Sequence, residues 1–154
     1  MPVAPSEPVR PIGFRQIRDA GDVPSDYGFG GRRHSAPAPE AFDELAAVFT
    51  MDMPTWNGDA LLDIDWAGDV AQLRVDGTTV DDRFWDGTRW TVSLRDVGAT
   101  AHSMLTLHVL SLSVESTVWL PADAAHSRGR AASGRVTHVA LRTRSSVAVA
   151  RSAP

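Results

Sequence analysis

The chain has 154 residues, of which 43% are hydrophobic, and a formal net charge of −4. This length fits one domain with a single core and falls well short of the ~250 residues of a typical (β/α)₈ barrel. The basic residues are all arginines scattered along the chain, which excludes the clustered basic face of a nucleic-acid-binding protein. The absence of cysteine excludes disulfides and thiolate metal sites.

Residues 1–40 are rich in proline, glycine, alanine and charged residues. Such a segment buries too little apolar area to offset the entropy of ordering it, so we predict a flexible arm or linker there and a β-sandwich domain over residues 41–154. The arm begins MPVAPSEPVR, without the apolar run of a signal peptide, and no run in the chain reaches the ~20 apolar residues of a membrane-spanning helix. We therefore expect a cytoplasmic protein without a membrane partner.

The first predicted elements are a helical turn over residues 39–47 and a strand over residues 48–53, which Pro54 ends. Asn57 and Gly58 then supply the left-handed positions of a tight hairpin turn.

The next strand alternates strictly. Leu62, Ile64 and Trp66 share one face, which should meet the core, and Asp63 and Asp65 share the other.

Ala67, Gly68 and Asp69 turn the chain out of that strand, and further strands are predicted over residues 70–75, 79–85 and 90–94, separated by turns at Asp76-Gly77 and Asp86-Gly87. Three consecutive hairpins would make a meander or part of a Greek key. Beyond them the pattern predicts strands over 105–109 and 117–120, a loop over 122–135, and closing strands over 136–141 and 147–149. Period-two alternation with a turn about every 8–12 residues is typical of an all-β, antiparallel sandwich.

Three segments resemble a known family: GDVAQLRVDG (68–77), DDRFWDGTRW (81–90) and LTLHVLSLSVESTVWLP (105–121). They are similar to the C-terminal jelly-roll, galactose-binding-like domain of bacterial β-galactosidases of glycoside hydrolase family 35. The resemblance implies a jelly-roll sandwich that packs on a catalytic barrel. In that family the catalytic glutamates lie in the barrel, so the resemblance carries no catalytic residue over to this chain.

The sequence itself offers no catalytic pair. The only glutamates are Glu7, Glu40, Glu44 and Glu115, and most aspartates, including a conceivable pair of Asp63 with Asp82, occupy turns or strand faces. The histidines show no paired metal-ligand spacing, so no metal site is predicted. A structural Ca²⁺ is the one cofactor considered, with oxygen ligands from Asp63, Asp65, Asp81, Asp82 and Asp86. A solvated strand face is favoured over it, because no ligand loop with fixed offsets is present.

The candidate ligand-binding residues are Arg83, Trp85, Asp86 and Arg89. A tryptophan flanked by arginine and aspartate suits a sugar, which stacks on the ring and bonds the charged groups through its hydroxyls. Alternation puts Phe84 and Trp85 on opposite faces of their strand, so we expect one aromatic of this hairpin in the core and one outward; whether Trp85 or Trp90 is an outward ring stays open. Aromatic packing across the hairpin is the favoured alternative.

These observations predict a non-catalytic accessory sandwich of a β-galactosidase-like glycoside hydrolase, with a catalytic glycosidase barrel as its partner. Two alternatives stay open: a free-standing carbohydrate-binding module for galactosides, and a structural or dimerising sandwich without a ligand. An outward tryptophan favours the module, and a broad apolar patch favours the accessory or structural role.

Overall fold

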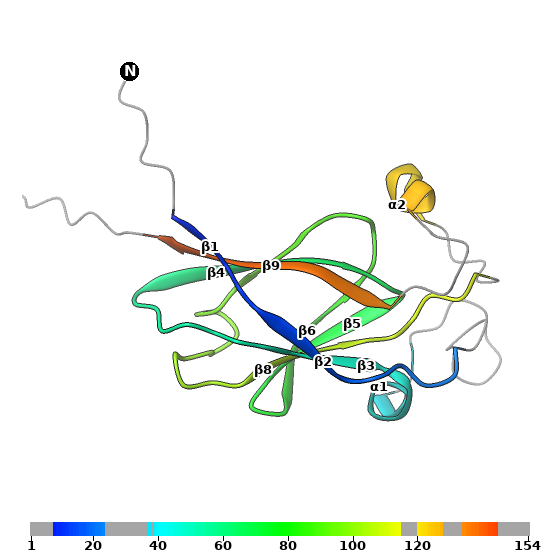
Figure 1. The fold of residues 1–154 in the computed structure, drawn as a ribbon, viewed down its shortest axis with the longest axis horizontal. Helices are drawn as coiled ribbons and strands as arrows, with labels where there is room; N and C mark the ends of the chain where they lie inside the picture. Colours follow the sequence, from blue (N-terminus) through cyan, green and yellow to red (C-terminus); the bar gives the residue numbers. More distant parts are fainter. Residues whose placement is uncertain (1–7, 24–36, 38, 115–119, 128–133, 145–154) are drawn as a thin grey trace, which may run out of the picture.

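The structure of the protein, a computed structural model, describes residues 8–23, 37, 39–114, 120–127 and 134–144. The predicted all-β fold is confirmed. Two antiparallel sheets form two layers of a jelly-roll-like sandwich, seen edge-on in Figure 1. Within the described ranges, no helix is long and apolar enough to cross a membrane.

The four-stranded sheet has the order β1-β9-β4-β7. Its strands are β1 (Val9–Pro11), β9 (Arg135–Arg144), β4 (Asp59–Ala67) and β7 (Trp90–Ser93). β4 and β9 pair along the whole length of β4, with one bulge between Asp65 and Trp66. This long pair forms the middle of the sheet.

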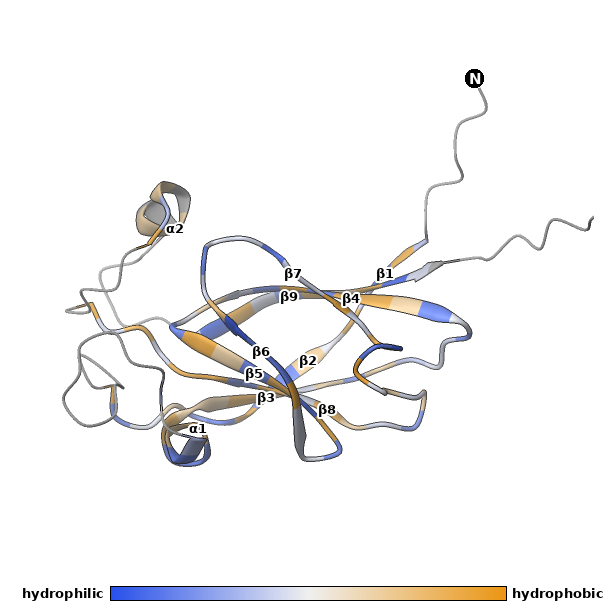
Figure 2. Ribbon diagram, turned by 180° about the vertical axis from the view of Figure 1, so that it is seen from behind, coloured by the Kyte–Doolittle hydropathy of each residue, from blue (hydrophilic) through white to orange (hydrophobic). Residues whose placement is uncertain are grey.

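The five-stranded sheet has the order β2-β3-β8-β5-β6. Its strands are β2 (Phe14–Arg18), β3 (Ala47–Met51), β8 (Leu105–Val109), β5 (Val70–Val75) and β6 (Thr78–Phe84). β6 is an edge strand and mostly hydrophilic, as its blue colour in Figure 2 shows. Polar edge strands discourage pairing with other chains.

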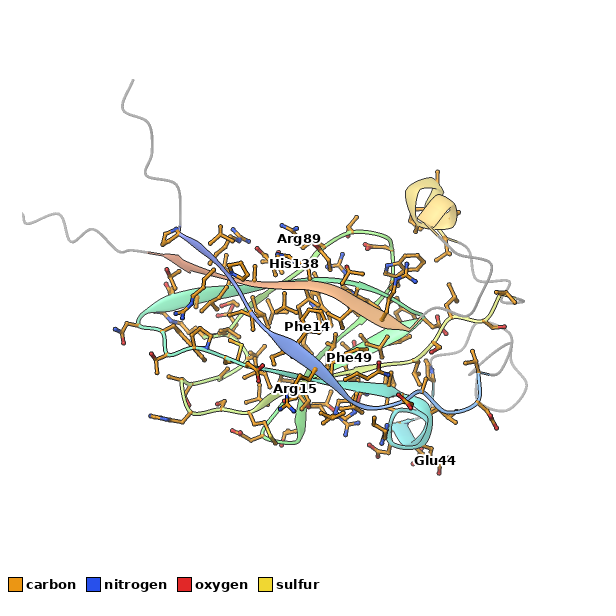
Figure 3. All side chains as sticks on the ribbon, in the orientation of Figure 1. Phe14, Arg15, Glu44, Phe49, Arg89 and His138 are labelled. Carbon is orange, nitrogen blue, oxygen red and sulfur yellow. The ribbon has the colours of Figure 1, made fainter. Side chains whose placement is uncertain are left out.

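The core lies between the two sheets. Leu62, Ile64 and Trp66 of β4 are at most 5% exposed, as their alternation predicts. From the other layer Leu73 and Leu107 are fully buried against them. Figure 3 shows Phe14 and Phe49 also pointing between the layers.

The predicted series of hairpins is wrong. Among the described strands, only β5 and β6 are joined by a tight hairpin, at Asp76 and Gly77, whose φ angles are 50° and 83°. The turns at 67–69 and 85–89, and the Asn57-Gly58 segment, each carry the chain from one sheet to the other. Alternation shows that a strand has one buried face. Strands of both sheets bury one face, so alternation does not show to which sheet a strand belongs.

The segment predicted as an arm, residues 1–40, contains two paired strands within residues 9–18. β1 pairs with β9, β2 pairs with β3, and Ile12 between them is 5% exposed. In Figure 1 this blue segment runs from one layer to the other. Edge strands this short show little apolar periodicity, because they bury only a few side chains. That the sandwich tolerates removal of the arm stays a prediction.

Two helices flank the sheets. α1 (Pro39–Leu45) forms where a helical turn is predicted, and α2 (Ala122–Ser127) forms inside the predicted loop. Phe42 and Ala46 at α1 pack with Val70 and Leu110 on the outside of the five-stranded sheet.

The closing strand also differs from the prediction. β9 is longer than predicted and pairs with β4 and β1. The strand predicted over 147–149 and most of that predicted over 117–120 lie outside the described residues.

Candidate functional site

The candidate residues Arg83, Trp85, Asp86 and Arg89 lie at the corner where the chain passes from β6 to β7. Trp85 is 6% exposed and Trp90 is 3% exposed, so both rings belong to the core. The expectation of an outward tryptophan at this corner is therefore wrong, whereas Phe84 and Trp85 do point to opposite sides, as their alternation predicts. The outward aromatic at this corner is Phe84, which is 58% exposed.

The short helix α2 packs against this corner. Ala124 of α2 is fully buried and belongs to the same core cluster as Trp85. Gly87 has a φ of 82°, and a Cβ added to it would lie 2.8 Å from the Cβ of Ala124. The turn therefore packs directly under α2. The alanine-rich sequence of α2 carries no apolar period, so sequence reasoning missed this contact.

Two of the candidate residues bond to each other inside the turn. Arg83 donates to Oδ2 of Asp86 at 2.9 Å and to Oγ1 of Thr88 at 2.8 Å. Oδ1 of Asp86 accepts from the Thr88 backbone N–H at 2.9 Å and from its hydroxyl at 2.6 Å. Burial by itself raises the pKa of Asp86, but the bonds from Thr88 and Arg83 outweigh it and lower the pKa to about 2.

Arg89 turns to the outside of the four-stranded sheet. Arg89 donates two hydrogen bonds to the Asp65 carboxylate, of 2.8 Å from Nε and 2.9 Å from Nη2. These hydrogen bonds lower the pKa of Asp65. Figure 3 shows Arg89 and His138 on this outer side, where His138 is the strand partner of Asp65. The corner thus brings the four candidate residues together, but their charged groups bind protein partners rather than converge on a shared space.

Asp63 departs from the solvated strand face that the sequence favours. It is 2% exposed and accepts two hydrogen bonds from Arg142, of 2.6 and 3.0 Å, and one of 2.7 Å from the Thr91 hydroxyl. Burial raises its pKa, but the Arg142 and Thr91 hydrogen bonds outweigh burial, so the pKa is lowered. Sequence reasoning missed Arg142 because β9 meets β4 only through long-range pairing.

The aspartates considered for catalysis or calcium are divided between the sheets. Asp63 and Asp65 lie on β4 of one sheet, and Asp81 and Asp82 lie on β6 of the other. Among the described residues, no group of three or more histidine, aspartate or glutamate side chains is placed to hold a metal ion.

A second polar cluster, which the sequence did not indicate, lies on the outside of the five-stranded sheet. Arg18 of β2 donates to the backbone oxygens of Phe42, Asp43 and Ala46, at the C-terminal end of α1, over 2.7–3.0 Å. Arg74 of β5 bonds Asp43 at 2.9 Å. These contacts hold α1 on the sheet.

His108 of β8 lies in this second cluster. Its Nε2 is 3.2 Å from the Thr106 hydroxyl, and its buried Nδ1 has no hydrogen-bond partner among the described residues. Burial, followed by the positive charges of Arg74 and Arg18, lowers its pKa to about 4.

A polar pocket of about 340 Å³ opens where β4 begins and β7 ends. Asp59 and Arg95, an ion pair, line it together with Ser93 and Asp96. It lies at the opposite end of β4 from Asp65 and Arg89 and includes none of the candidate residues.

No family model and no curated protein matches the sequence. Among solved structures, a β-glucuronidase of Bifidobacterium dentium, complexed with coumarin-3-O-glucuronide, aligns with 91% of this chain at 14% identity and a TM-score of 0.47. This chain covers 30% of the length of that chain. At so low a score, the fold rests on the strand pairing described above and not on this similarity.

Proposed function

We propose that the chain is a non-catalytic accessory β-sandwich of a β-galactosidase-like glycoside hydrolase and that it packs against a catalytic barrel. The sequence resemblance to family 35 motivates the choice of partner. A location in the cytoplasm is part of the same proposal.

The observation that carries the non-catalytic role is the state of the carboxylates. Asp63, Asp65 and Asp86 each bind an arginine, and each has a lowered pKa. A glycosidase needs a general acid whose pKa is raised, so that it stays protonated near neutral pH. Aspartates bound in this way serve the fold.

The buried corner favours packing over sugar binding. The tryptophan platform expected for a sugar needs an exposed indole ring, and Trp85 is 6% exposed. Phe84, which is 58% exposed beside it, offers an apolar contact to a protein partner. A free-standing carbohydrate-binding module is therefore kept as an outcome of the test.

The test mixes the full chain with the catalytic barrel of a family 35 β-galactosidase whose own C-terminal sandwich has been removed. We expect the isolated chain to show no turnover of 4-nitrophenyl β-galactoside and to bind the barrel in calorimetry. Phe84→Ala should weaken that binding, whereas Met104→Ala, at an equally exposed residue remote from the corner, should not.

Two results would contradict the proposal. One is turnover by the chain alone that disappears in Asp63→Asn. The other is binding of methyl β-galactoside by a chain that does not bind the barrel, which would favour the carbohydrate-binding module.

A further inference from the structure

Three places in the described chain have asparagine or aspartate followed by glycine: Asn57-Gly58, Asp76-Gly77 and Asp86-Gly87. At such a pair the glycine nitrogen can approach the preceding side-chain carbonyl carbon, because glycine has no Cβ to obstruct the approach. The three pairs differ in whether hydrogen bonds hold the side chain of the first residue.

Hydrogen bonds hold the two aspartates. Oδ1 of Asp76 accepts from the Met104 N–H at 2.8 Å, and the Asp76 N–H donates to the Met104 oxygen at 2.9 Å. Asp86 is held by Thr88 and Arg83, and its low pKa keeps it ionised. An ionised carboxylate is a poor target for a nucleophile, and a held side chain cannot turn toward the next nitrogen.

Asn57 is in the opposite situation. It is the only asparagine of the chain, and both it and Gly58 are exposed. Within the described residues, neither the Asn57 side chain nor the Gly58 N–H takes part in a hydrogen bond. The segment between β3 and β4 that contains them has no regular structure, and Gly58 has a φ of 73°. Unpaired, exposed backbone of this kind moves at little cost in free energy.

We propose that Asn57 is a site of spontaneous deamidation, with water as the only co-reactant. The Gly58 backbone nitrogen loses its proton to hydroxide and attacks Cγ of Asn57. The new N–Cγ bond closes a five-membered succinimide, and the Cγ–Nδ2 bond breaks to release ammonia. Water then opens the ring at Cγ to give aspartate, or at the main-chain carbonyl carbon to give isoaspartate. No oxidation or reduction takes place.

The product changes the entrance to β4. Each event replaces a neutral amide by a carboxylate, so the formal net charge of −4 becomes −5. The new charge lies two residues before Asp59, which pairs with Arg95 in the polar pocket. Isoaspartate also adds a methylene group to the backbone immediately before the strand.

The experiment ages the full chain in ¹⁸O-labelled water at mildly alkaline pH, both folded and in guanidinium chloride. Peptide mass spectrometry then locates the label, and isoelectric focusing counts the charge variants. We expect folding to slow conversion of Asn57 by no more than about tenfold, and to slow isomerisation of Asp76 and Asp86 by more than about a hundredfold.

The control is Asn57→Gln, which lengthens the side chain so that the strain-free five-membered ring cannot form, and which should remove the acidic variant. Two results would overturn the proposal. In one, Asn57 keeps its amide in the folded chain under conditions that convert it in the unfolded chain. In the other, the acidic variant persists in Asn57→Gln.

Discussion

The outer faces of the two sheets both bury polar side chains, but the two faces pair them with different groups. On the four-stranded sheet, Asp63 is buried and is neutralised by Arg142 across the strand pair. On the five-stranded sheet, Arg18 is bound by backbone oxygens at the end of α1, and His108 is uncharged near neutral pH. One face thus relies on a charge pair between strands, and the other on a helix end and a neutral imidazole.

The difference shows how the cost of burying a polar group depends on its partner. A buried carboxylate needs a fixed counter-charge, because desolvation penalises an isolated ion heavily. A guanidinium at a helix C-terminus instead meets unpaired carbonyls and the negative end of the helix dipole. The two faces should therefore fail under different mutations and at different pH.

Loss of Arg142 should have the largest effect. Arg142→Met leaves the carboxylate of Asp63, which is 2% exposed, without its counter-charge, and should lower the free energy of unfolding by about 3–5 kcal/mol. Guanidinium denaturation measures this. A loss below about 1 kcal/mol would mean that water solvates the Asp63 carboxylate or that another group neutralises it. The double variant Asp63→Asn/Arg142→Met should recover part of the loss.

Loss of Arg18 tests the other face. Arg18→Met removes charged hydrogen bonds to three carbonyl groups at the end of α1 and should cost about 2 kcal/mol. Arg15→Met is the matched control, because Arg15 lies exposed on the same strand. Equal losses in the two variants would show that the hydrogen bonds from Arg18 to the end of α1 do not stabilise the protein.

Acid should destabilise the two faces in sequence. The pKa of His108 is about 4 in the folded protein against an ordinary histidine value of 6.5, so the unfolded chain binds the proton first. Stability from this residue is present above pH 6.5 and is lost as the pH falls toward 4, by about 2 kcal/mol between pH 7 and 5.

Asp63, Asp65 and Asp86, whose pKa values are lowered, affect stability at a lower pH than His108 does. Their stabilisation is present above the unfolded pKa of about 3.8 and is lost as the pH falls further. Thermal melts from pH 7 to 3 check both steps. His108→Gln should remove the loss of stability between pH 7 and 5 and leave the loss below about pH 3.8. If the loss between about pH 7 and 5 is unchanged in this variant, it belongs to another group.

The smallest effect is expected at the exposed pair on the four-stranded sheet. The side chains of Arg89 and Asp65 are 53% and 32% exposed, so Arg89→Gln should cost less than about 1 kcal/mol. Denaturation of this variant beside Arg142→Met measures how far burial separates two ion pairs on one face. Comparable losses would contradict the role assigned to burial.

Strand positions could largely be predicted from the sequence. Leu62, Ile64 and Trp66 show which face of β4 is buried, and the Asp76-Gly77 turn marks a real hairpin. The candidate corner was only half predictable: its residues lie together, but the turn after Trp85 packs against α2, whose six residues carry no apolar period.

Local sequence patterns were enough to predict the all-β class, the inner face of the central strands and the turns that need glycine, because alternation and left-handed backbone are local properties. The tertiary structure alone decided to which sheet each strand belongs, that residues 9–18 supply edge strands to both, and that Asp63 is buried against Arg142. These features depend on residues far apart in the chain, such as Asp63 and Arg142, and no local pattern records which partner a strand or a charge will meet.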